Sequence, residues 1–284
     1  MTTEMKGKVV LLTGGTEGIG KAAAIELARR GATLVLVGRS PEKTARVVAE
    51  VSAAAGGAKV DSLLGDLSTI AEVRKVAGEF RAKYDRLDVL ANNAGGIFND
   101  YVTTADGLEM TFALNHMSYF VLTTELLPLL EKTPGSRVVS TSSGAHAAGS
   151  IDLGTIARRK GSAGWSAYAD SKLANILFTR ELARRVEGKD VFVGCYHPGF
   201  VRTAFGHNNN SGFFRSVTSL SQRMFGRTPE KGAETLVWLA TSDEAKAQQG
   251  AYFHDRKVSM STSRAKDDER ARGLWELSEK LCKA

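Results

Sequence analysis

The sequence predicts an α/β protein, a doubly wound parallel sheet of about seven strands with helices on both faces. Short apolar segments alternate with longer helical patterns along the chain, and this alternation is typical of parallel sheets joined by right-handed crossovers. The chain has 284 residues, of which 43% are hydrophobic and 24% are charged. This composition suits one continuous core, so we expect a single domain over residues 1–284.

The seven strands are expected at short apolar runs, near residues 8–13, 33–38, 59–64, 87–91, 136–142, 190–196 and 250–254. Helical patterns lie between them, up to Arg30 after the first strand, and then over 41–55, 69–83, 107–131, 165–187 and 229–240. A charged amphipathic helix is expected over 266–284. In such sheets ligands bind beyond the carboxyl ends of the strands, at the switch in strand order, so the site is expected there.

The first strand runs into a glycine-rich turn, Thr13-Gly14-Gly15-Thr16-Glu17-Gly18-Ile19-Gly20, and then into a helix. Unpaired N–H groups at a helix N-terminus, together with the helix dipole, favour a pyrophosphate. The glycines do not follow the G-x-G-x-x-G register, and a tight turn of any α/β protein is the alternative. The strand before and the amphipathic helix after favour a dinucleotide, bound by Gly14, Thr16, Glu17, Gly18, Ile19 and Gly20.

The second strand ends in Gly38-Arg39-Ser40, where a carboxylate would normally hold the ribose 2′-hydroxyl of NAD. No carboxylate is present, and the guanidinium of Arg39 can instead form a forked pair with a 2′-phosphate. Glu17 argues the other way, because its charge would repel that phosphate unless it is turned away or paired with a base. We expect NADP(H) as the cofactor, with NAD(H) less favoured.

Tyr168 and Lys172 begin an Ala-rich helical stretch and stand four residues apart, on one helix face. A free phenol titrates near pH ~10 and is a poor acid or base at neutral pH. An ammonium at ~4–5 Å attracts a phenolate by roughly 3 kcal/mol at an effective dielectric constant of ~20, which is worth about two pKa units. The spacing therefore suggests a tuned proton donor and acceptor, although many such pairs are solvated helix faces.

Together these features resemble the short-chain dehydrogenase/reductase family over nearly the whole chain, which implies a Rossmann-type fold. The matching segments are residues 13–20, Gly65-Asp66-Leu67, Asn92-Asn93-Ala94-Gly95, Asn115, residues 138–143, Tyr168 with Lys172, and Pro198-Gly199 with Val201 and Thr203. The resemblance places Asp66 and Leu67 by the adenine. It also lets Asn93 and Gly95 line the cofactor cleft, and it places Pro198, Gly199, Val201 and Thr203 over the nicotinamide.

The resemblance further implies a catalytic set of Asn115, Ser143, Tyr168 and Lys172. Tyr168 would exchange a proton with the substrate oxygen, and Ser143 would hold and polarise that oxygen. Lys172 would contact the nicotinamide ribose, and Asn115 would support a proton-relay water. Ser142 competes with Ser143, since adjacent strand residues face opposite sides and a shift in register would exchange them.

Within the family the chain looks most like the retinol-dehydrogenase-like branch. The likeness rests on Ser142-Ser143-Gly144-Ala145-His146, on the long stretch before Tyr168 and on Gly250-Ala251-Tyr252-Phe253. It implies a small apolar alcohol, ketone or aldehyde as substrate. Residues 204–226 correspond to the family's substrate lid, and their phenylalanines suit an apolar ligand. A mobile loop whose rings pack on the body is the alternative.

Two other functions remain open, an NADP(H)-binding sensor or scaffold protein without turnover, and the reduction of a carbon–carbon double bond. The net charge of +7 helps to attract an anionic dinucleotide. Nucleic acid is not expected as a partner, because the basic residues are dispersed and lack interleaved aromatic residues.

No apolar run approaches the ~20 residues that span a bilayer. Cys195 and Cys282 show no disulfide or metal-ligand pattern, so we expect a cytoplasmic protein without a metal. A homo-oligomer is left open. His116, His146 and His197 have no carboxylate at a recognisable spacing and are expected to be structural or surface residues.

Overall fold

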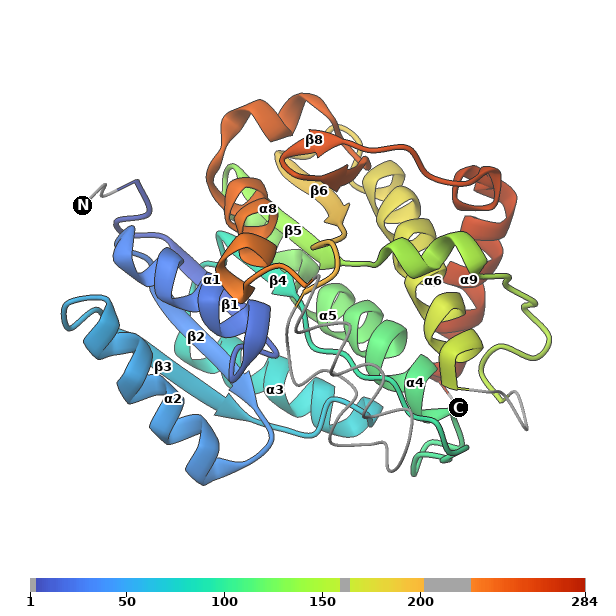
Figure 1. Cartoon of the computed structure of the whole chain (residues 1–284), viewed down its shortest axis with the longest axis horizontal. Helices are drawn as coiled ribbons and strands as arrows, with labels where there is room; N and C mark the ends of the chain where they lie inside the picture. The colour runs from blue at the N-terminus through green and yellow to red at the C-terminus, as the bar shows by residue number, and fades with distance from the viewer. Residues whose placement is uncertain (1–3, 159–163, 202–225, 284) are drawn as a thin grey trace.

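The computed structural model describes residues 4–158, 164–201 and 226–283, so Thr203 and lid residues 204–225 lie outside the described residues. The described strands form one sheet in the order β3-β2-β1-β4-β5-β6-β7-β8 (Figure 1). They are β1 (Val9–Thr13), β2 (Thr33–Gly38), β3 (Val60–Leu64), β4 (Val89–Asn92), β5 (Ser136–Thr141), β6 (Val191–Tyr196), β7 (Tyr252–His254) and β8 (Lys257–Val258). Neighbouring strands are parallel except for β7 and β8.

The strand order reverses at β1, which lies between β2 and β4. The predicted doubly wound sheet is thus confirmed. The switch point lies between β1, which is followed by the glycine turn, and β4, which ends in the Asn92-Asn93 segment. The additional strand, β8, follows a tight turn in which Asp255 and Arg256 have positive φ angles of 47° and 62°. Aspartate tolerates left-handed turn positions but arginine rarely occupies one, so this hairpin is not visible in the sequence.

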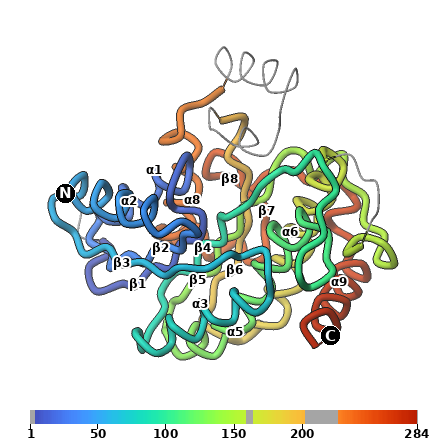
Figure 2. The backbone as a smooth tube through the Cα atoms, turned by 90° about the horizontal axis from the view of Figure 1, so that it is seen from below, coloured from blue at the N-terminus to red at the C-terminus, as the bar shows by residue number. Residues whose placement is uncertain are grey.

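Alternate side chains of the central strands enter two separate cores, which explains their continuous apolar sequences. Leu11, Leu90 and Val138 face one core, and their neighbours Val10 and Val139 face the other. The first core contains α3 (Ile70–Lys83), α5 (Ser118–Lys132) and α6 (Gly164–Arg185), with α9 (Asp268–Leu281) packed on α6. The second contains α1 (Gly18–Arg29), α2 (Pro41–Ala54) and α8 (Pro229–Thr241), on the opposite side of the sheet (Figure 2).

The helix expected over residues 107–131 differs from its prediction. It begins later, with a short α4 (Met110–Phe112), and passes through a π-helical segment (Ala113–Met117) before α5. The buried carboxylate of Glu109 accepts hydrogen bonds from the backbone N–H groups of Thr111 and Phe112 and so begins the helix. The π-helical segment contains Asn115, and such segments often occur at functional sites.

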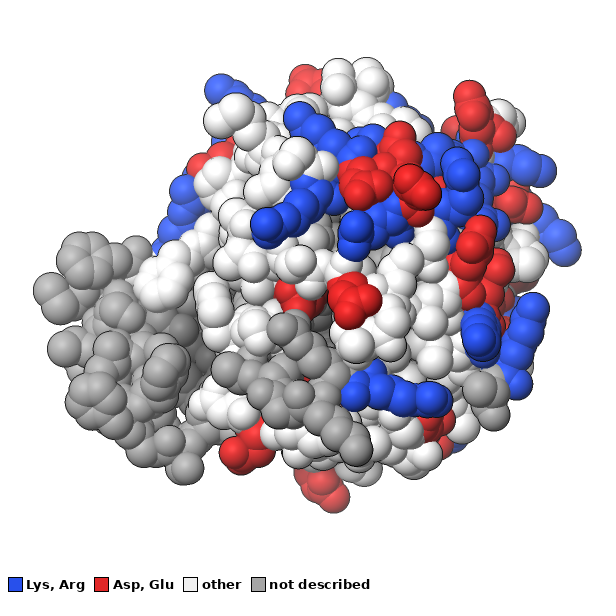
Figure 3. Space-filling model, turned by 90° about the vertical axis from the view of Figure 1, so that its right-hand side faces the viewer, with Lys and Arg blue, Asp and Glu red and all other residues white. Residues whose placement is uncertain are grey.

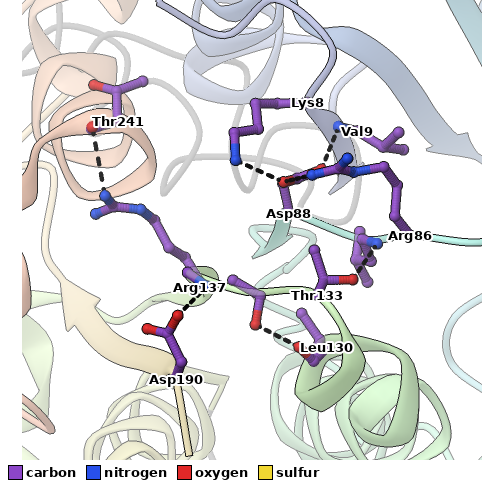
Figure 4. Close-up of polar contacts among 12 residues, drawn as sticks. Lys8, Val9, Arg86, Asp88, Leu130, Thr133, Arg137, Asp190 and Thr241 are labelled. Atoms are coloured by element: carbon purple, nitrogen blue, oxygen red, sulfur yellow. Dashed lines mark hydrogen bonds and ion pairs between the residues drawn. The ribbon is translucent and has the colours of Figure 1, made fainter.

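The amino-terminal edge of the sheet is closed by polar contacts (Figure 4). The buried carboxylate of Asp88 accepts the N–H of Val9 at 2.9 Å and pairs with Lys8 at 3.1 Å and with Arg86. Arg137, also buried, donates to carbonyl oxygens at the end of α8, including that of Ser242 at 2.7 Å. This edge is therefore structural, and the opposite, carboxyl-terminal edge is left for ligands.

The face that includes α9 carries basic side chains interspersed with acidic ones (Figure 3). Arg180 and Arg184, for example, both pair with Asp268, at 2.8 and 2.6 Å. Charge on this face is thus partly compensated within the protein. Among the residues that the structure describes, no helix is both long and apolar enough to cross a membrane.

Candidate active site

The glycine turn is joined to the end of β4 by hydrogen bonds. The hydroxyl of Thr13 accepts the N–H groups of Asn93 and Ala94 at 2.9 and 3.0 Å. The amide of Asn93 donates in return to the carbonyl oxygens of Thr13 and Gly14 at 3.1 and 3.2 Å. A Cβ atom on Gly20 would lie 2.1 Å from the Gly14 oxygen, so only glycine fits there.

This turn has the features of an anion cradle. Helix α1 begins at Gly18, and the side chain of its N-cap residue, Glu17, makes no capping hydrogen bond. The first N–H groups of the helix are therefore not satisfied by that side chain and are available to an anionic group. The fit to a dinucleotide pyrophosphate supports the predicted roles of Gly14, Thr16, Gly18, Ile19 and Gly20, which stay predictions.

The expected repulsion between the Glu17 carboxylate and a 2′-phosphate is reduced by a basic residue that was not predicted from the sequence. Lys43, in the first turn of α2, pairs with the Glu17 carboxylate at 2.5 Å. Arg39 is exposed at the end of β2, four residues before Lys43. Arg39 precedes α2, so the helical four-residue rule does not apply to it, and no spacing in the sequence links Lys43 to Glu17, 26 positions away. The Glu17 charge is thus compensated, as one of the two sequence hypotheses required.

Asp66 and Leu67 are the residues expected by the adenine. Asp66 lies just beyond β3, and one of its carboxylate oxygens accepts the N–H of Ser68 at 3.0 Å. Leu67 is buried. These positions are at the same carboxyl edge as Arg39, on the β2–β3 side of the glycine turn (Figure 1). The structure thus brings the predicted adenosine-side residues to one half of the sheet.

Asn115 is fully buried and connects three elements. Its amide donates to the Gly96 carbonyl oxygen at 2.9 Å and to the Ser171 hydroxyl at 3.0 Å, and its Oδ1 accepts the Gly96 N–H at 2.8 Å. A Cβ atom on Gly95 would lie 3.1 Å from Asn115 Oδ1 and 3.5 Å from the Lys172 ammonium. The chain after β4, the π-helical segment and α6 therefore meet at Gly95.

Lys172 and Tyr168 lie together on α6 at this meeting point. The Lys172 ammonium donates to the Thr141 carbonyl oxygen at 3.2 Å and lies 5.5 Å from the centre of the Tyr168 ring. Burial lowers the pKa of Lys172 to about 7. Burial also raises the pKa of Tyr168 to about 12, and a hydrogen bond from the Ser143 hydroxyl opposes this rise.

The net pKa of Tyr168 in this structure is raised, so the prediction that the phenol pKa is lowered is wrong. Removal from water penalises the phenolate and the ammonium alike, and burial is the largest cause of both pKa shifts. At neutral pH Tyr168 is accordingly a protonated phenol.

The structure separates the two candidate serines. The Ser142 hydroxyl is buried and donates to the Lys172 carbonyl oxygen at 2.7 Å, so it holds β5 against α6. Ser143 begins a short 3₁₀ helix (Gly144–Ala148), and its Oγ accepts the N–H of Ala145 at 3.2 Å. Its hydroxyl also hydrogen-bonds the Tyr168 phenol. Ser143, as predicted, is the serine beside the phenol.

The segment after β6 returns to the glycine turn. Gly199 has a φ of +82°, and its N–H donates to His197 Nδ1 at 3.2 Å. Val201 forms a bridge with Arg227, and a Cβ atom on Gly232 would contact both Val201 and Ile19, at 2.8 and 3.2 Å. Val201 thus lies near the start of α1, and the predicted roles of Pro198, Gly199 and Val201 over the nicotinamide stay predictions.

Several candidate residues near the centre of the carboxyl edge are linked by hydrogen bonds. Asn93, next to the glycine turn, lies 3.3 Å from the Thr141 hydroxyl, and the Thr141 carbonyl contacts Lys172. Within residues 4–158, 164–201 and 226–283, no three His, Cys, Asp or Glu side chains are grouped to hold a metal ion. The arrangement offers an anion cradle, a phenol, a hydroxyl and an amine, which together suit acid–base chemistry beside a dinucleotide.

Comparison with known proteins identifies the family. The sequence profile described as short chain dehydrogenase matches residues 8–212. A Streptomyces protein (strain C5) provisionally named daunorubicin C-13 ketoreductase DnrU is 42% identical over 277 residues, 96% of this chain and 92% of its own length. Mouse retinol dehydrogenase 14 is 40% identical over 286 residues, 97% of this chain and 86% of its own.

A solved Escherichia coli CFT073 structure, provisionally described as a short chain dehydrogenase and complexed with NADPH, superimposes with a TM-score of 0.69. It is 28% identical, and the match covers 89% of this chain and 98% of that one. The predicted resemblance to retinol dehydrogenases is confirmed. The chain therefore belongs to the short-chain dehydrogenase family and is an NAD(P)-dependent oxidoreductase.

Proposed function

We propose that this enzyme interconverts an alcohol and a carbonyl group on an apolar small molecule, with NADP(H) as cofactor and Tyr168 as general acid and base. The observation that carries the proposal is the contact between the Ser143 hydroxyl and the Tyr168 phenol, with the Lys172 amine beside them. A carbonyl oxygen placed between the two hydroxyl groups would accept a hydrogen bond from each. That arrangement polarises the carbonyl and aligns a proton donor with its oxygen.

The dinucleotide, when bound, supplies or accepts the hydride. In the reducing direction Tyr168 would give its phenolic proton to the substrate oxygen. The raised pKa of Tyr168 keeps this proton in place at neutral pH, and Ser143 stabilises the phenolate that is left. Lys172, with a pKa near 7, can hold or release a proton in the working range and can restore the phenol. Asn115 positions the backbone beside that amine.

NADP(H) is favoured over NAD(H) by the charges near the predicted ribose site. Arg39 is exposed there, and Lys43 compensates Glu17. The similar Escherichia coli structure is complexed with NADPH, which supports the same preference.

An apolar substrate is favoured by the aromatic residues near the phenol. The Trp165 side chain is 56% exposed, and its ring centre lies 5.9 Å from that of Tyr168. The names of the two relatives refer to retinol and to daunorubicin. We take retinaldehyde-like aldehydes and polycyclic aromatic ketones as the first compounds to test.

The test is Tyr168→Phe, which keeps the ring and removes the proton. With a panel of apolar aldehydes and ketones, followed by absorbance of the reduced nicotinamide, we expect kcat to fall at least ~10²-fold. The dissociation constant for NADPH should change by less than about twofold, because the ring still packs in place. Tyr84→Phe is the matched control, since this tyrosine hydrogen-bonds Asp61, beside β3 and outside the catalytic set.

Near-normal turnover by Tyr168→Phe would contradict the proposed role. Tight NADPH binding by the natural chain without turnover on the whole panel would favour the sensor or scaffold function. Conversion confined to carbon–carbon double bonds, unaffected by Ser143→Ala, would instead identify a double-bond reductase.

A further inference from the structure

His146 lies directly behind Ser143 and contacts it twice. Its backbone N–H donates to the Ser143 carbonyl oxygen at 3.1 Å, and its ring Nδ1 lies 2.8 Å from the same oxygen. The residue is buried, 5% exposed, within the 3₁₀ helix that follows β5. Two hydrogen bonds from one residue thus converge on the carbonyl of the predicted catalytic serine.

These contacts determine the protonation of the ring. A carbonyl oxygen can only accept, so Nδ1 must carry the proton and donate it. The Tyr252 oxygen lies 3.3 Å from the same Nδ1, and the two rings pack edge to face with centres 4.9 Å apart. The other nitrogen, Nε2, is buried and has no hydrogen-bond partner among the described residues. A proton there would be buried without an acceptor, which disfavours the imidazolium form.

The groups around the ring agree with a neutral histidine. Tyr252, from β7, stacks in turn on His197, from the end of β6, with ring centres 5.5 Å apart. Burial lowers the pKa of His146, and the contact with the Ser143 carbonyl opposes this effect. The ring is therefore a neutral donor at neutral pH, and its neighbours are aromatic rings rather than carboxylates.

Ser143 connects His146 to the Tyr168 phenol. Ser143 has an extended backbone, its Oγ accepts the Ala145 N–H, and its hydroxyl also hydrogen-bonds the Tyr168 phenol. Rotation of the Ser143 peptide would move the hydroxyl away from that oxygen. We propose that His146, as its neutral Nδ1–H tautomer held by Tyr252, is a positioning residue that fixes Ser143 against Tyr168. This inference rests on the proposed alcohol–carbonyl chemistry.

The first test reads the tautomer without any substrate. Nitrogen-15 spectra of the histidine rings in the full chain, assigned by comparison with His146→Asn, should show His146 protonated at Nδ1 and not at Nε2 from pH 6 to pH 8. A ring protonated at Nε2, or a charged ring in this range, overturns the inference.

The second test compares three variants in the carbonyl reduction assay. His146→Phe keeps an aromatic ring but loses the donor, and we expect kcat to fall about tenfold, the upper effect of one hydrogen bond, with the NADPH dissociation constant changed less than about twofold. His146→Asn, whose amide can donate to the same carbonyl, should return kcat to within about threefold of the natural enzyme. Val186→Ala, a buried residue beyond the end of α6, is the control for lost stability alone.

Each outcome decides a different point. A His146→Phe variant with a lowered melting temperature but unchanged kcat, like Val186→Ala, overturns the positioning role. A tenfold loss that His146→Asn does not restore also overturns it. If the natural chain turns over no compound in the panel, the proposed function fails, and this role fails with it.

Discussion

The contact between Glu17 and Lys43 predicts how this enzyme distinguishes NADPH from NADH. We consider Lys43→Met, which keeps most of the aliphatic stem and removes the charge. Lys43 and Glu17 are 36% and 49% exposed, so their fields act through a water-like medium. A unit charge ~7 Å from a doubly charged 2′-phosphate is then worth about 1 kcal/mol before screening by salt.

The substitution removes one positive charge, so the repulsion by the Glu17 carboxylate, which that charge had cancelled, is no longer compensated. The loss is about 0.5–1 kcal/mol after screening, so kcat/KM with NADPH should fall about 2- to 5-fold. NADH has no 2′-phosphate, and its kcat/KM should change by less than about twofold. The measurement is the kcat/KM ratio for the two cofactors with one carbonyl substrate.

The double variant Glu17→Gln/Lys43→Met serves as the control, because it removes the unpaired carboxylate as well. It should recover most of the lost free energy of NADPH discrimination, because the two removed charges are opposite and lie close together. Raising the salt concentration should reduce the effect of Lys43→Met. An equal loss of kcat/KM with NADH and NADPH would show that Lys43 acts on the turn and not on the phosphate, and the electrostatic argument would be refuted.

Two further predictions concern the cofactor turn and the core. Gly20→Ala should weaken NADP(H) binding by at least about tenfold in a fluorescence titration, since a Cβ atom would lie 2.1 Å from a backbone oxygen. Gly78→Ala is the control, because this position in α3 is open, and it should stabilise the fold slightly. His116 is buried beside Ser278, and burial lowers its pKa from 6.5 to about 4. The unfolded chain therefore binds the proton first, so the stability contribution is present above pH 6.5 and decreases as the pH falls to 4, by up to about 3 kcal/mol. His116→Gln should give a shallower pH dependence in urea unfolding; an unchanged slope would contradict this assignment.

The order of strands and helices could be predicted from the sequence because both depend on local periodicity. Buried parallel strands are continuous apolar runs, and amphipathic helices repeat every 3.6 residues. The exceptions have local causes. The β8 hairpin depends on positive φ angles at Asp255 and Arg256, and the π-helical segment around Asn115 follows from contacts with Gly96 and Ser171. Neither leaves a pattern in neighbouring residues.

Residue chemistry also determined which groups the site offers. A glycine turn before a helix, an arginine in place of a carboxylate after the second strand, and a tyrosine four residues before a lysine each indicate a function through their own properties. Those inferences needed only spacing and residue type. They led to the family that the comparisons confirm.

Only the tertiary structure decided how these groups are paired, which way their side chains face and whether they are charged. Lys43 lies 26 positions from the Glu17 that it compensates, and Ser142 faces α6 while Ser143 faces the phenol. Burial raises the Tyr168 pKa, opposite to the direction expected from Lys172 alone. Desolvation and the direction of a side chain are set by neighbours distant in sequence, because water is excluded only once the sheet edge has assembled. Spacing along the chain can therefore identify an acid, but not whether it is charged.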